Sequence, residues 1–388
     1  MAKKNTKKSN DNTLFSVDAK ALVSAIDRVS GIVAGPEVSY CIRNGERLHF
    51  IGTRDDTFAC VDLGEGSEGG QIIFVPEIQT FKGMVKGRNT LNFAVVGNLL
   101  EFKSGNFKGN LKYEQQANAA AVGTIEMMLD RVSKDNAALK VNAEFFKHVN
   151  KAVAMTRLTC QFIDNFVPTA TVVFNGKQLD VVAQDQWHIH YYSEEVDEKL
   201  VPKKTIKPFT INVGTQIFGT IDKVVGSDLS INLSGDSFII TGEDIGIVLP
   251  PLQEVDPKMA IDFTLNLKKP VVSFKTDTAM AQIINNLNTL VKSKEGVDIK
   301  MDIKEGKIRL SHESDYGSAA DAFKVKGFKG KEISLRLDPR IFFDTFRAIQ
   351  HAGEFTFEVF NNDAGVPAIY RMTGSIGESS LYAVGYSG

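Results

Sequence analysis

Residues 14–33 read LFSVDAKALVSAIDRVSGIV and contain the two patterns from which most of the chain is built. After Leu14, the four residues Phe15–Asp18 alternate between apolar and polar side chains, which is typical of a short, half-buried β-strand. Leu22, Ile26, Val29 and Val33 then follow at the spacing of one helix face. The stretch therefore predicts a strand that runs directly into an amphipathic helix.

The same strand-to-helix pattern occurs six times, at intervals of about 64 residues. The six predicted strands are Leu14–Asp18, Ile72–Pro76, Leu139–Ala143, Phe209–Val213, Val272–Thr276 and Ile333–Asp338. Short strands separated by turns such as Asn44-Gly45 and Asn175-Gly176 follow each predicted helix, and Asn-Gly between apolar runs favours a hairpin. The repeated unit is therefore β-α-β-β-β.

One such unit has a single helix to cover a small sheet, which makes a poor core, whereas two packed units bury a face of each sheet. The sequence thus predicts an α+β protein of three pseudo-repeated domains, each made of two units. Their expected ranges are 13–130, 131–257 and 258–388, after a disordered basic tail at residues 1–12. The boundaries are placed near 117–135 and 250–257, where no periodic apolar pattern is evident.

Composition excludes several other classes of protein. The 388 residues include no run of about 18 apolar residues, so we expect no membrane-spanning helix. The N-terminus has no apolar stretch of the secretory type, and three widely spaced cysteines fit a reducing compartment. We therefore expect a cytoplasmic protein.

The net charge of -2 conceals an uneven distribution. The six predicted helical windows hold 13 basic and 6 acidic residues, so the strands and loops are acidic. A basic set of helices suits a polyanion such as DNA, although Lys and Arg also enrich on any exposed helix because they are good helix formers. The candidate DNA-binding residues are Lys20, Arg28, Lys82, Lys86, Arg88, Lys147, Lys151, Arg157, Lys223, Arg340 and Arg347.

Motifs for catalysis or cofactor binding are weak. Residues 64–69 (GEGSEG) match G-x-G-x-x-G, but a strand follows where a dinucleotide site needs a helix. His188 and His190 alternate on one strand near Asp185 and could bind a metal, but no further ligand completes a site. We therefore predict no catalytic residues, no metal and no cofactor. Trp187 fits either core packing or an exposed anchor at a binding surface.

Four stretches together resemble the bacterial DNA polymerase III beta subunit, the sliding-clamp family. They are Leu22–Val33, Ala183–Ile189, Ile308–Phe323, and Pro367-Ala368 with the closing Leu381–Val384. The resemblance spans residues 13–388 in the family's order and spacing. It implies a head-to-tail homodimer whose helices line the inside of a ring around duplex DNA. It also implies that the ring tethers a DNA polymerase, is loaded by a clamp loader, and performs no catalysis.

The resemblance also places a pocket for partner peptides and a dimer interface. The pocket residues would be Trp187, His188, Ile189, Leu249, Pro250, Ala383 and Val384. Gln186-Trp187 stands where the family has Gly-His, and the C-terminus also departs from the pattern, as in a phage clamp matched to its own polymerase. At the interface, Phe107 and Leu111 would meet Leu290 and Val291 of the second chain; core packing is the alternative for these four.

Two other functions remain open from the sequence. The chain could be a clamp-like scaffold that binds protein and does not encircle DNA. It could also be an enzyme that uses His188, His190 and Asp185, although nothing else in the sequence supports that hypothesis.

Overall fold

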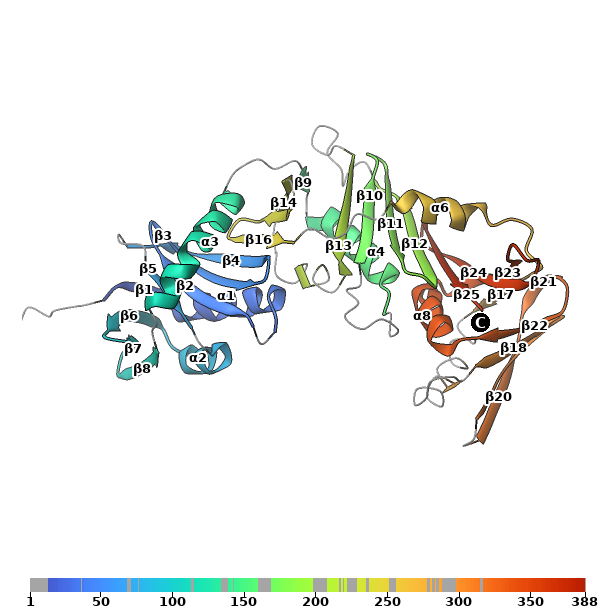
Figure 1. Ribbon diagram of the computed structural model, residues 1–388, viewed down its shortest axis with the longest axis horizontal. Helices are drawn as coiled ribbons and strands as arrows, with labels where there is room; N and C mark the ends of the chain where they lie inside the picture. The colour runs from blue at the N-terminus through green and yellow to red at the C-terminus, as the bar shows by residue number, and fades with distance from the viewer. Residues whose placement is uncertain are drawn as a thin grey trace, which may run out of the picture. The chain divides into compact units, whose positions relative to one another are not determined.

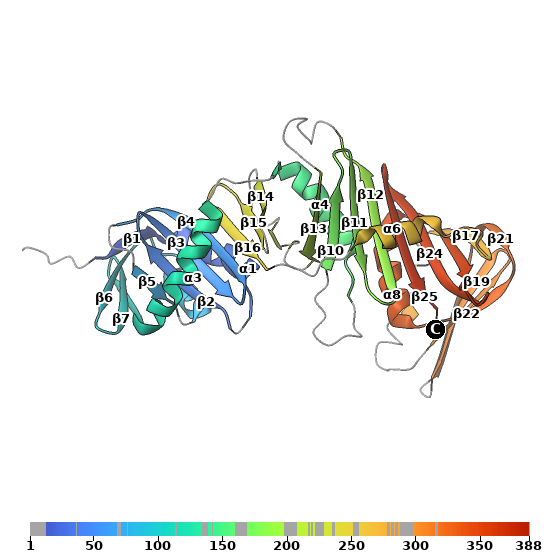
Figure 2. The same cartoon turned by 45° about the horizontal axis from the view of Figure 1, so that its top comes forward.

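The computed structural model describes most of the chain, in two compact units. It describes residues 13–35, 37–67, 71–75, 77–112, 115–133, 139–141, 143–159, 169–197, 208–215, 218, 220–221, 229–234, 237–250, 256–277, 280, 283, 286–287, 298–314 and 317–387. The first compact unit comprises residues 1–143 and 220–251, and the second comprises 144–219 and 252–388. Figures 1 and 2 show the elements of each unit in two views.

The first compact unit contains an eight-stranded and a four-stranded antiparallel sheet, in the orders β5-β2-β3-β4-β16-β15-β14-β9 and β1-β6-β7-β8. Its strands are β1 (Phe15–Asp18), β2 (Ser39–Asn44), β3 (Arg47–Arg54), β4 (Thr57–Glu65), β5 (Gln71–Phe74), β6 (Thr90–Val96), β7 (Leu99–Ser104), β8 (Phe107–Lys112), β9 (Leu139–Val141), β14 (Leu229–Ser234), β15 (Ser237–Thr241) and β16 (Ile245–Leu249). Its helices are α1 (Ala19–Ile32), α2 (Ile78–Val85) and α3 (Gln115–Ser133).

The second compact unit contains a nine-stranded sheet, ordered β13-β10-β11-β12-β25-β24-β23-β17-β21, and a four-stranded sheet, ordered β20-β19-β18-β22. Its strands are β10 (Thr169–Phe174), β11 (Gln178–Gln184), β12 (His188–Glu195), β13 (Phe209–Gly214), β17 (Val272–Asp277), β18 (Ile299–Lys304), β19 (Lys307–Ser314), β20 (Gly317–Lys324), β21 (Lys326–Gly330), β22 (Ile333–Leu337), β23 (Glu354–Asn361), β24 (Pro367–Ile376) and β25 (Ser379–Tyr386). Its helices are α4 (Ala143–Thr156), α6 (Pro257–Asn266) and α8 (Pro339–Ile349), with the 3₁₀ turn η1 (Gln350–Ala352).

The predicted α+β class is confirmed, and the β-α-β-β-β order is complete in the first, second, third and sixth repeats; most of the helical windows of the fourth and fifth repeats lie outside the described residues. In the first repeat, for example, β1 leads into α1, and β2, β3 and β4 follow. The Asp18 carboxylate caps α1 by accepting a hydrogen bond from the Ala21 amide at 2.8 Å. Leu22, Ile26 and Val29 are then fully buried on one face of the helix, which is why this stretch forms a strand followed by a packed helix.

The large sheets are built from strands of different repeats. In the first unit, β4, the last strand of the first repeat, pairs with β16, the last strand of the fourth. In the second unit, β12 ends the third repeat and pairs with β25, which ends the sixth. Residues of the range 131–257 are therefore shared between the two compact units, and the division into three domains stays a prediction.

A helix that the sequence pattern did not reveal spans most of the first predicted boundary, and a second one follows directly after the other boundary. Near the first boundary, Ile125 and Met128 of α3 pack on Ile51 and Phe58 of the eight-stranded sheet, with other apolar residues of that sheet. At the second boundary, α6 begins at Pro257, where the Asp256 carboxylate caps it, and packs on the nine-stranded sheet. Neither helix showed a strong apolar period, because each buries only a narrow stripe of side chains.

Among the described residues, no helix is both long enough and apolar enough to cross a membrane.

Candidate functional sites

Eight of the described candidate DNA-binding residues have exposed side chains, and five of these form no ion pair or cation–π contact with a described residue. The five are Lys20 on α1, Lys86 after α2, Lys147 and Lys151 on α4, and Arg157 just beyond α4. Lys147 and Lys151 lie one helical turn apart, while Phe146, Val149 and Val153 bury the other face of α4. This amphipathic arrangement leaves the two ammonium groups in solvent.

Two other candidates are neutralised by acidic neighbours. Arg28 makes two hydrogen bonds to the Asp244 carboxylate, at 2.6 and 2.8 Å, and these bonds lower the pKa of Asp244. Lys82 of α2 forms an ion pair with Asp27 of α1. A basic residue that already holds a carboxylate adds less to the field that attracts a phosphate backbone, so these two are weaker candidates than the exposed lysines.

The remaining candidates also have partners. The Arg88 guanidinium lies 4.0 Å from the centre of the Phe107 ring, in a cation–π contact. Arg340 pairs with the helix-capping Asp338 at 2.9 Å, and Arg347 pairs with Asp344. Lys223 lies outside the described residues.

Asp185 organises the turn between β11 and β12. Its carboxylate accepts hydrogen bonds from the backbone amides of Trp187 and His188, each at 2.7 Å, and from Nδ1 of His188 at 2.9 Å. The side chains of Asp185 and His188 are 2% and 0% exposed, whereas Trp187 is 42% exposed. The turn therefore buries the aspartate and histidine and presents the tryptophan to solvent.

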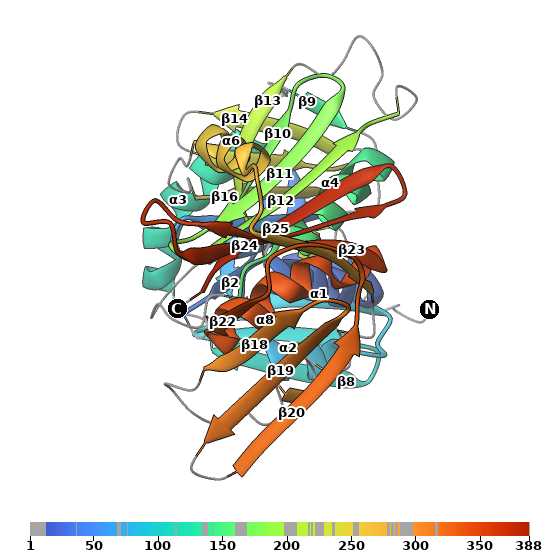
Figure 3. The same ribbon diagram turned by 90° about the vertical axis from the view of Figure 1, so that its right-hand side faces the viewer.

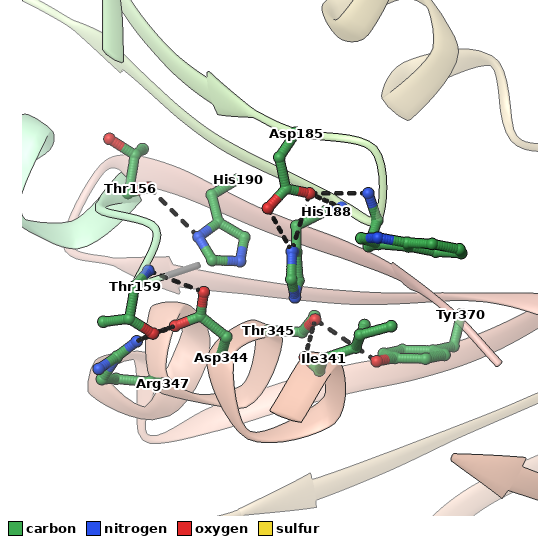
Figure 4. A network of polar contacts seen from close by, with 11 residues as sticks. Thr156, Thr159, Asp185, His188, His190, Ile341, Asp344, Thr345, Arg347 and Tyr370 are labelled. Atoms are coloured by element: carbon green, nitrogen blue, oxygen red, sulfur yellow. Dashed lines mark hydrogen bonds and ion pairs between the residues drawn. The ribbon is translucent and has the colours of Figure 1, made fainter. Parts of the chain in front are cut away.

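His190 lies on the same face of β12 as His188, with ring centres 5.8 Å apart. Its Nδ1 donates to the Thr156 carbonyl at the end of α4, at 3.2 Å. Burial, with a smaller contribution from neighbouring His188, lowers the pKa of His190 to about 3, so this ring is neutral at pH 7. Figure 4 shows both imidazole rings directed from the sheet toward α8.

A second, partly buried contact in Figure 4 ties the segment after α4 to α8. The Asp344 carboxylate accepts hydrogen bonds from the Thr159 backbone amide at 3.0 Å and from the Thr159 hydroxyl at 2.5 Å, and it pairs with Arg347. These contacts give Arg347 a structural role. In the described part of the chain, no group of three or more His, Cys, Asp or Glu residues is placed to hold a metal.

The residues expected to form the partner pocket divide between two faces of the nine-stranded sheet. His188 lies opposite Gly385 in the strand pairing, and a side chain at Gly385 would meet Tyr370 and Thr345 on the α8 side. Ile189 and Val384, one residue along, therefore face the other side, where α6 packs (Figure 3). Leu249 and Pro250 belong to the first compact unit, whereas Ala383 pairs with His190 on the α8 side.

Helix α6 covers the apolar surface that contains Ile189 and Val384. These two residues are 8% and 0% exposed, and Ala260, Ile261 and Phe263 of α6 pack in the same cluster. The expected pocket residues on β12 and β25 are all buried, whereas Trp187, at the turn before β12, is exposed. Reasoning from the sequence missed α6. Ile261, Phe263 and Leu265 alternate with polar residues, which is the pattern of a strand and conceals the helical period.

The expected dimer-interface residues of β8 lie on an edge strand of the four-stranded sheet, next to which the described residues place no further strand. Phe107 and Leu111 are half-buried and alternate with exposed Lys108, Asn110 and Lys112. The Phe107 ring lies 6.0 Å from that of Phe102, so it extends the core toward the edge. Leu290 and Val291 lie outside the described residues.

Comparison with known proteins identifies the architecture. No protein-family model and no curated protein sequence matches the chain. Among solved structures, it is similar to the DNA polymerase III beta chain of Streptococcus pneumoniae, with a TM-score of 0.76 and 14% identity over 96% of this chain and 99% of that one. It is also similar to the DNA polymerase sliding clamp of Bacillus subtilis, with a TM-score of 0.75 and 14% identity over 96% and 98% of the chains. For the beta subunit of Thermotoga maritima the TM-score is 0.73, at 14% identity and the same coverage. The chain therefore has the fold of the bacterial DNA polymerase III beta subunits, the sliding-clamp fold.

Proposed function

We propose that this protein is a DNA sliding clamp: a ring that encircles duplex DNA without reading its sequence and tethers a DNA polymerase. The observation that carries the proposal is the sliding-clamp fold over 96% of the chain, together with the six-fold repeat. The role is topological, so it assigns no catalytic step to any residue. A cytoplasmic location, in a bacterium or in the host of a phage, follows from this role.

The strand pairing supports closure of the ring by a second copy. Two junctions inside the chain join the last strand of one repeat to the last strand of the repeat three further on: β4 with β16, and β12 with β25. Applied to the second and fifth repeats, the same rule predicts a pairing of β8, the last strand of the second, with β20, the last strand of the fifth that follows this order. Each of these strands is an edge of its four-stranded sheet. We propose that β20 of one copy pairs with β8 of the other, which makes a head-to-tail homodimer.

The composition of the two edges suits such a pairing. Natural sheets protect exposed edges with charges, proline or bulges, because a free edge recruits other strands. Strand β20 contains Ala319, Ala320 and Ala322 and a single acidic residue, Asp321, while β8 contains Gly109. Neither strand contains proline, and the lysines of β8, Lys108 and Lys112, are opposite in charge to Asp321 of β20, so a pairing of the two strands brings unlike charges together.

The exposed lysines supply the contacts to DNA in this proposal. Lys86, Lys147 and Lys151 can approach phosphates through solvent without breaking an ion pair, and contacts to phosphates carry no sequence information. The partner peptide of a polymerase or clamp loader would bind near Trp187, Ile189 and Val384, on the α6-covered face of the nine-stranded sheet. A clamp-like scaffold that binds protein without DNA is the competing function, favoured by the pairing of Arg28 and Lys82 with carboxylates.

Retention on circular DNA tests the proposal. The protein is incubated with its loader and a nicked plasmid, and bound protein is separated by gel filtration in high salt, which suppresses phosphate contacts. A clamp stays on the nicked circle and dissociates once a restriction enzyme linearises it. Equal retention on circular and linearised DNA would exclude encirclement, and no retention on either would favour the scaffold.

A further inference from the structure

The α6-covered face of the β12–β25 junction is a continuous apolar surface. Ile189 pairs directly with Val384, and the rings of Tyr191 and Tyr382 stack beside them at 5.4 Å. Phe360 belongs to the same cluster. Trp187, 42% exposed, lies at the turn that leads into this surface. The residues of this surface are buried beneath α6, so removal of that helix would expose a contiguous apolar patch of the kind that binds another segment of chain.

Helix α6 occupies this surface with a short and incomplete set of contacts. Ala260 and Thr264 are fully buried against the sheet, but Ile261 and Phe263 are only half-buried. With ten residues, α6 is too short to be a stable helix away from the sheet, because isolated helices of this length are marginal in water. Its conformation therefore depends on the contacts that hold it there.

The fit of α6 contains a specific defect. The Thr264 hydroxyl is buried, and it has no hydrogen-bond partner within the described structure. A buried hydroxyl without a partner opposes burial of the segment that carries it. One polar anchor acts in the other direction: Arg371 donates to the Thr264 carbonyl at 2.6 Å while it also pairs with Glu358 at 2.7 Å. Of the two polar contacts of Arg371, departure of α6 breaks the bond to the Thr264 carbonyl and leaves the pair with Glu358 in place.

We propose that α6 is a displaceable internal occupant of the partner site, and that a partner peptide binds by replacing it on the Ile189–Val384 surface. The inference rests on the proposed function for the identity of this surface as a partner site. Because α6 is tethered, it competes at a high effective concentration, and the apparent affinity for a partner falls in proportion to the fraction of molecules in which the surface is open.

The chemistry of the displacing segment follows from α6 itself. The surface accepts an aliphatic side chain, an aromatic one and a second aliphatic one, as Ile261, Phe263 and Leu267 provide. The partner is therefore a short peptide with apolar residues at this spacing, and it binds better if it carries no hydroxyl at the position of Thr264. Small acidic or basic ligands do not fit this surface.

The test uses the full-length protein and a fluorescein-labelled synthetic peptide of residues 256–268 (DPKMAIDFTLNLK), measured by fluorescence anisotropy. The variant F263A weakens the hold of α6 and should bind the peptide about tenfold more tightly than the wild type. T264V keeps the shape, removes the unpartnered hydroxyl and should bind it several-fold more weakly. Met128→Ala changes α3, which covers the equivalent junction of the first unit, and should leave the affinity unchanged.

Opposite effects of F263A and T264V, with no effect of the α3 control, support displacement. Equal affinities for all four proteins overturn it, as does absence of binding to F263A at about 1 mM peptide while circular dichroism shows that variant folded. The measurement contains no DNA, so its outcome is separate from encirclement. A protein that binds the peptide as expected but fails to stay on circular DNA would retain this inference and lose the proposed function.

Discussion

Ile189 and Val384 are directly opposite each other in the pairing of β12 with β25, although 195 residues separate them in the sequence. Their contact joins the third repeat to the sixth. Phe58 and Val248 hold the equivalent place in the other large sheet, where the first repeat meets the fourth. Both pairings join the last strand of one repeat to the last strand of the repeat three further on. The simplest partner for the edge strand β8 is therefore β20 of a second chain, in a pairing of the same kind.

Truncation of the β8 edge should separate the dimer. The double variant F107A/L111A removes the half-buried side chains that extend the core to this edge. We expect the dimer dissociation constant to rise about tenfold for each 1.4 kcal/mol by which the substitutions weaken association. Sedimentation should show the wild type at twice the 42.6 kDa chain mass and the variant moving toward the monomer. K108A/K112A, on the other face of the strand, is the matched control; a wild type that stays monomeric at micromolar concentration contradicts the prediction.

Removal of the exposed lysines should weaken binding to DNA without unfolding the protein. For K86A/K147A/K151A, we expect the slope of log affinity against log salt to fall by about 0.9 for each phosphate that is no longer neutralised. Binding to a linear duplex at several salt concentrations measures the slope. Lys258→Ala, which changes an exposed lysine on α6, should leave it unchanged. An unaltered slope in the triple variant would remove these lysines from the DNA-binding surface.

Burial of His190 should make stability depend on pH. Because the folded state holds its pKa near 3 and the unfolded value is about 6.5, the unfolded chain binds a proton in this range and the folded chain does not. The contribution of neutral His190 is complete above pH 6.5 and declines as the pH falls toward 3. Titration of His190 should therefore lower the free energy of unfolding, measured in urea, by up to about 1.4 kcal/mol for each unit that the pH falls within this range.

His190→Asn should flatten that part of the profile, because asparagine can donate to the Thr156 carbonyl without titrating. His351→Asn, which changes an exposed histidine, serves as the control. A wild type and an H190N variant with parallel profiles between pH 4 and pH 6 would show that His190 takes no part in the acid sensitivity.

Asp344 and Thr159 should be energetically coupled. Asp344→Asn weakens a charge-assisted hydrogen bond from the Thr159 hydroxyl and the pair with Arg347, and should lower the free energy of unfolding by about 2–4 kcal/mol. Thr159→Val removes only the hydroxyl and should cost about 1 kcal/mol. The double variant should be destabilised by less than the sum of the two single effects, as chemical denaturation will measure. Strict additivity would mean that the carboxylate acts without Thr159.

The six repeats could be predicted from the sequence because each begins with a pattern of neighbouring residues, an alternating strand followed by an amphipathic helix. Strand β1 alternates strictly, Asp18 caps α1, and the period of three to four residues in α1 follows from one buried face. The connecting helices α3 and α6 could not be found in this way. Their packing depends on the apolar face of a sheet assembled from distant strands, so the decisive contacts of Ile125 or Ala260 have no local pattern.

The candidate site shows the same limit. Basic residues on helices were identifiable by type, but their partners were not: Arg28 finds Asp244 at a separation of 216 residues. The two-residue alternation of β12 placed His188 and His190 on one face. The alternation could not show that Ile189, on the opposite face of β12, is covered by helix α6, which begins 68 positions further along the chain.

The order of addition on end-blocked DNA tests encirclement most directly. A linear duplex carries biotin at both ends, and streptavidin is added either before or after the protein. A closed ring must thread over a free end, so protein added first should remain on the DNA through a high-salt wash and leave after restriction cleavage between the blocks. Protein added to DNA that is already blocked should wash off. Equal retention in both orders, or retention that survives cleavage, would contradict the account.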